Sequence, residues 1–208
     1  MFKLKDLVFH VESAVLTGNY KDKGISEKME HMQASFIWKI DIRMSEGSFM
    51  YTNKNAYEPA RPHLYHDNGF TLGVRSWKAI EGQVKEWTFP QNKKGEEAGK
   101  LYVFEHEKVN NGKIEFIKRM GNIFYVRWNG TADVFWNESY GRDVPFLFEG
   151  EVVFEGINAF CNKIYNLKEL QASMVKFADL NEFELISEKS YKYSSGKQSQ
   201  DWFFKPAS

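Results

Sequence analysis

Apolar and polar residues alternate most regularly between Met32 and Met44. Every even position carries an apolar side chain, and every odd position except Ile37 carries a polar or charged one. The apolar set is Met32, Ala34, Phe36, Trp38, Ile40, Ile42 and Met44. A period of two predicts a β-strand with one buried face and one face toward water. Because a slip by one residue would expose the whole apolar set, the register of this strand is strongly specified.

The same alternation recurs along most of the chain. A weaker version over 7–17 precedes a polar, glycine-containing segment at 18–24, which predicts a long hairpin with the 32–44 strand. Further alternating segments lie at 70–74, 101–104, 114–119, 124–128, 146–154 and 183–191. Asn111-Gly112 and Gly121-Asn122 are typical of tight turns between antiparallel strands.

These segments predict a mostly β fold in a single domain that spans residues 1–208. We expect about ten strands in an antiparallel meander, which closes into a barrel or packs as a two-sheet sandwich. The alternation fits both architectures, so this alternative stays open.

One helix is expected in the C-terminal half, at about 167–178. Asn166 can cap its first turn, and Glu169 stands where a capping-box acid reaches back to the cap. Leu167, Leu170, Met174 and Phe177 follow at helical spacing. A helix this short is marginal in isolation, so we expect it to pack on the sheet.

Composition adds little about function but excludes some classes. The chain has 28 basic and 28 acidic residues and no net charge, so it lacks the basic excess that nucleic acids or an anionic membrane surface attract. Its one cysteine, Cys161, allows no intrachain disulfide, and we expect it to be a buried structural thiol. With neither a signal-peptide core nor a long apolar run, we expect a soluble, cytoplasmic protein.

A metal site is the strongest local candidate for chemistry. His63, His66 and Asp67 offer nitrogen and oxygen ligands of the kind that zinc accepts. The two histidines are three positions apart, whereas the helical zinc motif places them four apart. A third distant ligand, His31 or His106, would have to converge on them. The alternative interpretation is a polar loop whose histidines have no shared role.

Aromatic residues offer a second kind of site. Phe, Tyr and Trp make up 16% of the chain, and most are expected in the core of the sheet. Five of them lie in or beside two long predicted loops at 53–69 and 90–100. They are Tyr51, Tyr57, Tyr65, Trp87 and Phe89. Loops on a rigid scaffold often carry recognition residues, so these five are predicted to bind a ligand or partner.

Three functions remain open at this point. The first is a non-enzymatic binding domain, with an accessory or neutralising role, that recognises a protein partner through the loop aromatics. The second is a β-barrel that binds a small apolar ligand, and the third is a metal-dependent hydrolase that uses the 63–67 loop. No nucleophile elbow, phosphate-binding loop or dinucleotide fingerprint is present, so we expect no cofactor and favour a protein that is not an enzyme. The oligomeric state is not fixed by the sequence.

Overall fold

The computed structural model describes residues 1–22, 34–66, 68–87, 98–162, 165–192 and 198–207. Strands make up 65% of it, in a large mixed sheet of 12 strands and a second sheet of two, with a single α-helix. This confirms the mostly β fold with one helix in the C-terminal half. No helix in these ranges is long and apolar enough to cross a membrane.

The chain divides into two compact units. Unit 1 consists of Met1–Val15, Lys39–Phe70 and Glu81–Val153, and unit 2 of Leu16–Trp38, Thr71–Ile80 and Phe154–Ser208. The strands that lie in unit 1 are β1 (Phe2–Leu4), β2 (Leu7–Phe9), β5 (Gly47–Tyr51), β6 (Ala56–Ala60), β7 (His63–Tyr65), β8 (Val84–Trp87), β9 (Lys100–Tyr102), β10 (His106–Met120) and β11 (Ile123–Val134). Unit 2 holds α1 (Leu167–Met174), β13 (Phe183–Lys192) and β14 (Gln198–Pro206). The prediction of a single domain stays a prediction.

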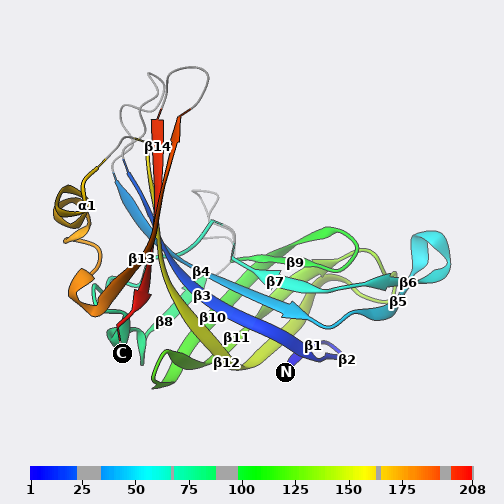
Figure 1. Cartoon of the computed structure of the whole chain (residues 1–208). Helices are drawn as coiled ribbons and strands as arrows, with labels where there is room; N and C mark the ends of the chain where they lie inside the picture. Colours follow the sequence, from blue (N-terminus) through cyan, green and yellow to red (C-terminus); the bar gives the residue numbers. More distant parts are fainter. Residues whose placement is uncertain (23–33, 67, 88–97, 163–164, 193–197, 208) are drawn as a thin grey trace. The chain divides into compact units, whose positions relative to one another are not determined.

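Three long strands contribute residues to both units. They are β3 (Val11–Lys21), β4 (Ser35–Met44) and β12 (Gly141–Cys161), and they run side by side in the order β4-β3-β12 (Figure 1). The pairing continues as β11-β10-β9-β7-β4-β3-β12, and β12 also pairs with β11. The pairings of these seven strands therefore return to their starting strand, and the alternative between a barrel and a sandwich stays open.

The predicted alternating strand is confirmed over the part that the structure describes. In β4, the even positions from Phe36 to Met44 are buried and the odd ones lie toward solvent or are half-buried. Hydrogen bonding to β7 fixes the register, with Asp41 opposite Tyr65 and Arg43 opposite His63. The register places the apolar face of β4 in the core, as the period of two requires.

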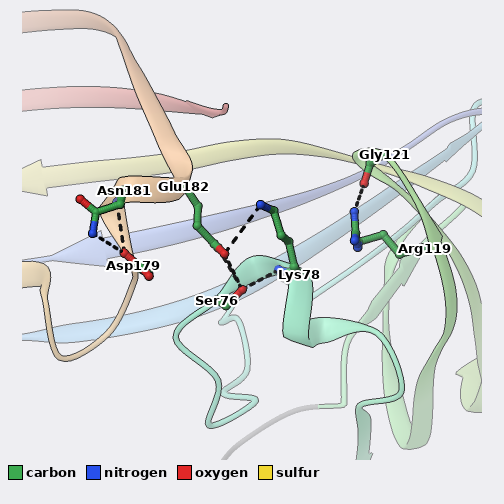
Figure 2. Close-up of polar contacts among 7 residues, drawn as sticks. All are labelled: Ser76, Lys78, Arg119, Gly121, Asp179, Asn181 and Glu182. Atoms are coloured by element: carbon green, nitrogen blue, oxygen red, sulfur yellow. Dashed lines mark hydrogen bonds and ion pairs between the residues drawn. The ribbon is translucent and has the colours of Figure 1, made fainter. Parts of the chain in front are cut away.

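The predicted turn at Asn111-Gly112 is wrong, whereas the one at Gly121-Asn122 is confirmed. Both residues of the first pair lie inside β10, where Gly112 pairs with Gly130 of β11. A Cβ atom on Gly112 would stand 3.2 Å from Nε1 of Trp128, so close packing and not a reversal explains this glycine. At the true turn, Gly121 has a φ of 59°, and its carbonyl accepts a 2.8 Å hydrogen bond from Nη1 of Arg119 (Figure 2).

The core of unit 1 is built from large aromatic side chains of β10, β11 and β12. Phe116 meets Phe124 edge to face at 5.8 Å, and Trp128 meets Phe146 in the same way at 6.1 Å. Such pairs contribute about 0.5–1.5 kcal/mol each beyond the burial of their surface. Gly130 leaves room for this packing, because a Cβ atom there would stand 2.9 Å from the Phe146 ring.

The helix α1 begins as predicted and ends earlier. The Asn166 side chain accepts from the Glu169 N–H, and the Glu169 carboxylate accepts from the Asn166 N–H, both at 3.0 Å. The last helical residue is Met174, so the predicted end at about 178 is several residues too far. The helix is held to β3 by a 3.1 Å hydrogen bond from the Tyr20 hydroxyl to Oγ of Ser173.

A polar cluster in unit 2 joins the segment before β8 to the one before β13 (Figure 2). Oγ of Ser76 donates to the carboxylate of Glu182 at 2.9 Å, and Nζ of Lys78 lies 3.9 Å from the same carboxylate. Asp179 accepts two hydrogen bonds from Asn181, at 3.2 Å and 3.0 Å, and so caps the short helix η3 (Leu180–Glu182). These contacts tie the two connecting segments together.

Replacing Gly130 by alanine should destabilise the protein by roughly 1–3 kcal/mol, the usual cost of overpacking. The new Cβ would lie 2.1 Å from the Asn111 carbonyl oxygen, so the backbone would have to move. Gly150→Ala is the matched control, because its Cβ would meet its neighbours at ordinary contact distances of 3.6 Å or more. Urea unfolding of both variants measures the difference, and equal stabilities would contradict the packing argument.

Replacing Glu182 by alanine should lower the free energy of unfolding by about 1–3 kcal/mol, because Ser76 loses a charge-assisted hydrogen bond. Glu184→Ala removes an exposed glutamate of the neighbouring strand and should change stability by less than about 0.5 kcal/mol. Thermal unfolding followed by circular dichroism compares the two. A Glu182 variant as stable as the Glu184 variant would show that the cluster contributes nothing.

Candidate functional site

Strands β4 and β7 belong to one long hairpin of unit 1. The chain leaves β4, continues through β5 and β6, and returns as β7. The Met44 N–H donates to the Pro62 carbonyl at 2.9 Å, so the pairing of β4 with β7 continues toward β5 and β6. The reversal at Thr52–Lys54 ends on Asn55, whose φ of 50° lies in the left-handed region that asparagine tolerates. The β5–β6 hairpin thus extends beyond the large sheet on a well-defined turn (Figure 1).

The outward side chains of β4, β7, β9 and β10 form two rows across the strands. The first row is Arg43, His63, Tyr102 and His106, and the second is Asp41, Tyr65, Lys100 and Lys108. Each of the eight is exposed or half-buried, whereas the residues between them point into the core. We call these eight residues the two-row face.

Direct contacts link the members of this face. Nε2 of His63 lies 2.9 Å from Oδ1 of Asp41, and Nε of Arg43 donates to the same oxygen at 3.2 Å. The His63 ring stacks on Tyr65 at 4.4 Å, and the Tyr65 hydroxyl is hydrogen-bonded to Nδ1 of His106 at 3.0 Å. The His106 ring in turn lies 5.0 Å from Tyr102. The aromatic and charged side chains are therefore held as one connected surface.

The acidic residue of the face is held in its charged form. Partial burial raises the pKa of Asp41, but the hydrogen bonds and charges of His63 and Arg43 outweigh it and leave the pKa below its usual value. Asp41 thus remains a carboxylate that orients the His63 ring and the Arg43 side chain. No serine, threonine or cysteine is among the eight residues of the face, so it lacks the nucleophile that an Asp–His pair would activate.

The two predicted histidine ligands point to opposite sides of the chain. His63 points outward from β7, whereas His66 is 2% exposed and its ring packs against Trp87 at 4.9 Å and Phe70 at 5.3 Å. Asp67 and His31 lie outside the described residues. His106 joins Tyr65 and not the two predicted histidine ligands. Within the part of the chain that the structure describes, no group of three or more His, Cys, Asp or Glu side chains could hold a metal ion.

Three of the five predicted binding aromatics lie in or beside the long hairpin. Tyr65 belongs to the two-row face. The Tyr51 ring stacks on Phe104 at 4.8 Å, and its hydroxyl donates to Glu105 at 3.0 Å. Tyr57 of β6 is 72% exposed and pairs across the hairpin with Met50 of β5. An aromatic ring exposed to that extent at the end of an ordered hairpin is available for contact.

The other two predicted aromatics do not join this surface. Trp87 is 8% exposed and packs on His66 and, edge to face, on Phe70 at 5.8 Å. Its surroundings are those of a core residue. Phe89 lies outside the described residues.

Five residues of the two-row face carry no local sequence signal of a site: Asp41, Arg43, Lys100, Tyr102 and Lys108. The alternation of β4 already indicated that Asp41 and Arg43 point to solvent. What could not be found was the pairing of β7 with β9, which places Tyr102 opposite His63. That pairing joins segments almost 40 residues apart in the chain, and no local pattern encodes it.

Comparisons with protein-family models, with curated proteins and with solved structures found no match to this chain.

Replacing Asp41 by asparagine should destabilise the protein at neutral pH by up to about 1 kcal/mol, since the pair is partly exposed to solvent. The lowered pKa means that the Asp41 carboxylate contributes stability above the ordinary aspartate range and that this contribution is lost as pH falls through the folded-state pKa. The difference between variant and wild type should therefore vanish in acid. Urea unfolding at neutral pH and at about pH 2.5 tests this. Glu86→Gln, on an exposed position of β8, should show no such pH-dependent difference.

Proposed function

We propose that this chain is a non-catalytic binding protein that recognises a protein partner through the two-row face and the adjoining β5–β6 hairpin. One observation supports this most directly. Four rings, those of His63, Tyr65, Tyr102 and His106, lie together on the outside of the sheet, between basic side chains. Tyrosine and arginine are enriched at the centres of protein interfaces, because they combine contact area with hydrogen bonding.

The charges of the face favour an acidic partner surface. Its rows contain the basic residues Arg43, Lys100 and Lys108 and the single acid Asp41. Two histidines add positive charge when protonated. Complementary charge speeds encounter with the partner and suppresses association with basic surfaces.

The hairpin supplies an anchor of a different kind. Tyr57 and Met50 lie on one face of the β5–β6 pair, while Phe49 and Tyr51 on the other face pack against Phe9 and Phe104. The inner face thus fixes the hairpin to unit 1, and the outer face leaves a tyrosine and a methionine for contact. A rigid exposed tyrosine loses little conformational entropy on binding, which suits an anchor residue.

The two-row face does not suit either of the alternative functions. A hydrolase at residues 63–67 would need His63 and His66 on one side of the chain, and they point to opposite sides. The β-barrel alternative would hold its small apolar ligand in an interior cavity lined by apolar groups, and the two-row face, whose aromatic residues are interleaved with charges, is not such a site.

Photo-cross-linking in the source cells tests the proposal. We expect a cross-linker side chain in place of Tyr57 to capture a discrete protein partner, because this position lies on the contact surface. The matched control is a cross-linker at Tyr125 of β11, which is also exposed, at 40%, but lies on a different strand and is bound to Glu149. Mass spectrometry identifies the adducts.

A variant with a reversed charge at Arg43 tests whether the partner is recognised through the charges of the two-row face. Arg43→Glu should reduce the Tyr57 adduct by roughly tenfold through loss of electrostatic complementarity, and a cooperative thermal unfolding curve shows that the variant is folded. Identical adducts at both cross-linker positions, or adducts indifferent to the Arg43 charge, would refute the proposal.

A further inference from the structure

A surface pocket in unit 2 lies on the outer face of β12, β14 and β13, separate from the residues of the proposed partner surface. Its volume is about 380 Å³, within the range of small-molecule sites. The residues that line it are Asn158, Ala159, Phe160, Ser187, Lys189, Tyr191, Asp201, Trp202 and Phe203. All nine belong to unit 2 and to strands, so the pocket rests on regular structure.

Strand pairing fixes the arrangement of the lining side chains. Asp201 of β14 lies between Phe160 of β12 and Lys189 of β13. In the adjacent row, Phe203 lies between Asn158 and Ser187. The Asp201 carboxylate therefore belongs to the central strand of the pocket. The Phe203 ring lies along the same strand, the Phe160 ring on one neighbouring strand, and the Lys189 ammonium group on the other.

The exposure of Phe160 depends on a glycine earlier in β12. Burial alternates along this strand with the even positions inward as far as Phe154, and with the odd positions inward from Ile157 onward. The change occurs at Gly156, whose φ of 136° is unfavourable for other residues and whose Cβ would meet the Phe204 carbonyl oxygen at 2.0 Å. Without this change, Phe160 would point into the core. Instead it is 39% exposed and lines the pocket.

The pocket contains one acidic and one basic side chain, Asp201 and Lys189. Within the part of the chain that the structure describes, no ion pair joins Lys189 to Asp201, although they are direct neighbours in the register. Oδ1 of Asp201 is inaccessible to solvent and has no hydrogen-bond partner among the described residues. Among the described residues, no contact compensates the negative charge of this carboxylate, so a cationic group in the pocket would stabilise it through charge.

We propose that this pocket binds a small zwitterion that carries an ammonium group and a carboxylate. The ammonium group would lie against Asp201 and the rings of Phe160, Phe203 and Tyr191, since aromatic rings attract cations through their electron-rich faces. The carboxylate would be bound by Lys189. Asn158 and Ser187 can add hydrogen bonds at the edge of the pocket.

The charges of the pocket distinguish this ligand from simpler ones. Among the described residues that line the pocket, Asp201 and Lys189 are the only charged ones, and their charges sum to zero. A simple cation would be attracted by Asp201 and repelled by the neighbouring Lys189. A simple anion would be attracted by Lys189 and repelled by Asp201. A zwitterion satisfies both groups at once.

Glycine betaine and two analogues test the proposal with the whole protein. Choline keeps the quaternary ammonium group and lacks the carboxylate, and 3,3-dimethylbutanoate keeps the carboxylate and replaces the ammonium group by an uncharged one of the same shape. We expect titrations followed by amide NMR to shift residues of β12, β13 and β14, with betaine binding roughly tenfold more tightly than either analogue.

Pocket variants make the assignment specific. Asp201→Asn should weaken betaine binding by about tenfold through loss of charge attraction, and Phe160→Leu by about two- to fivefold. Lys189→Met should weaken betaine and strengthen choline, which reverses their order. Glu184→Gln, on an exposed position of β13, is the control and should change neither affinity. Thermal unfolding curves of all variants confirm that they are folded.

Three results would overturn the proposal. They are the absence of betaine-induced shifts in β12, β13 and β14, equal affinity for betaine and 3,3-dimethylbutanoate, or an unchanged ligand order in the Lys189 variant. None of them bears on the proposed partner surface, because Tyr57 and Arg43 belong to unit 1 and are not altered in these experiments.

Discussion

Backbone hydrogen bonds between β4 and β7 hold Arg43 opposite His63, and this register decides the chemistry of both faces of the sheet. Ile42 and Leu64, one position away on each strand, are consequently fully buried opposite each other. A slip by one residue would bring the charged side chains into the core and the aliphatic ones into water. The aliphatic face therefore enforces the arrangement of the polar face, although the two never touch.

Buried and exposed positions also alternate along β12, and the alternation shifts by one position at Gly156. The strand pairs with β11 and β1 over its first part and with β14 near its end. Val152 and Phe154 keep the even positions inward, and the glycine at 156 changes the parity. Everything after this point is displaced by one position, so that Cys161 is buried and Phe160 is not. One residue with unusual backbone freedom thus converts a core strand into the wall of a pocket.

Local patterns in the sequence were enough for some features. The burial pattern of β4, the capping box at Asn166 and the buried Cys161 follow from periodicity or from contacts within a few residues. Other features depend on long-range packing. The sequence around Gly112 is typical of a turn, but this position lies in a strand and needs a glycine because the Trp128 ring packs against it. Trp87 lies beside a predicted loop, but its ring packs on His66. Neither partner is near in the chain, so no local rule identifies it.

The Asp201 carboxylate at the pocket wall lacks the ion pair that its neighbour in the register could supply. Leaving a polar atom buried without a partner costs about 1–3 kcal/mol, a sizeable part of the roughly 5–15 kcal/mol that stabilises a typical domain. At Asp201, β13 presents an ammonium group on the neighbouring register position, yet the two groups remain apart. A purely structural pair would gain by closing this distance. Two separated opposite charges beside exposed aromatic rings are instead the arrangement that a bound zwitterion would complete.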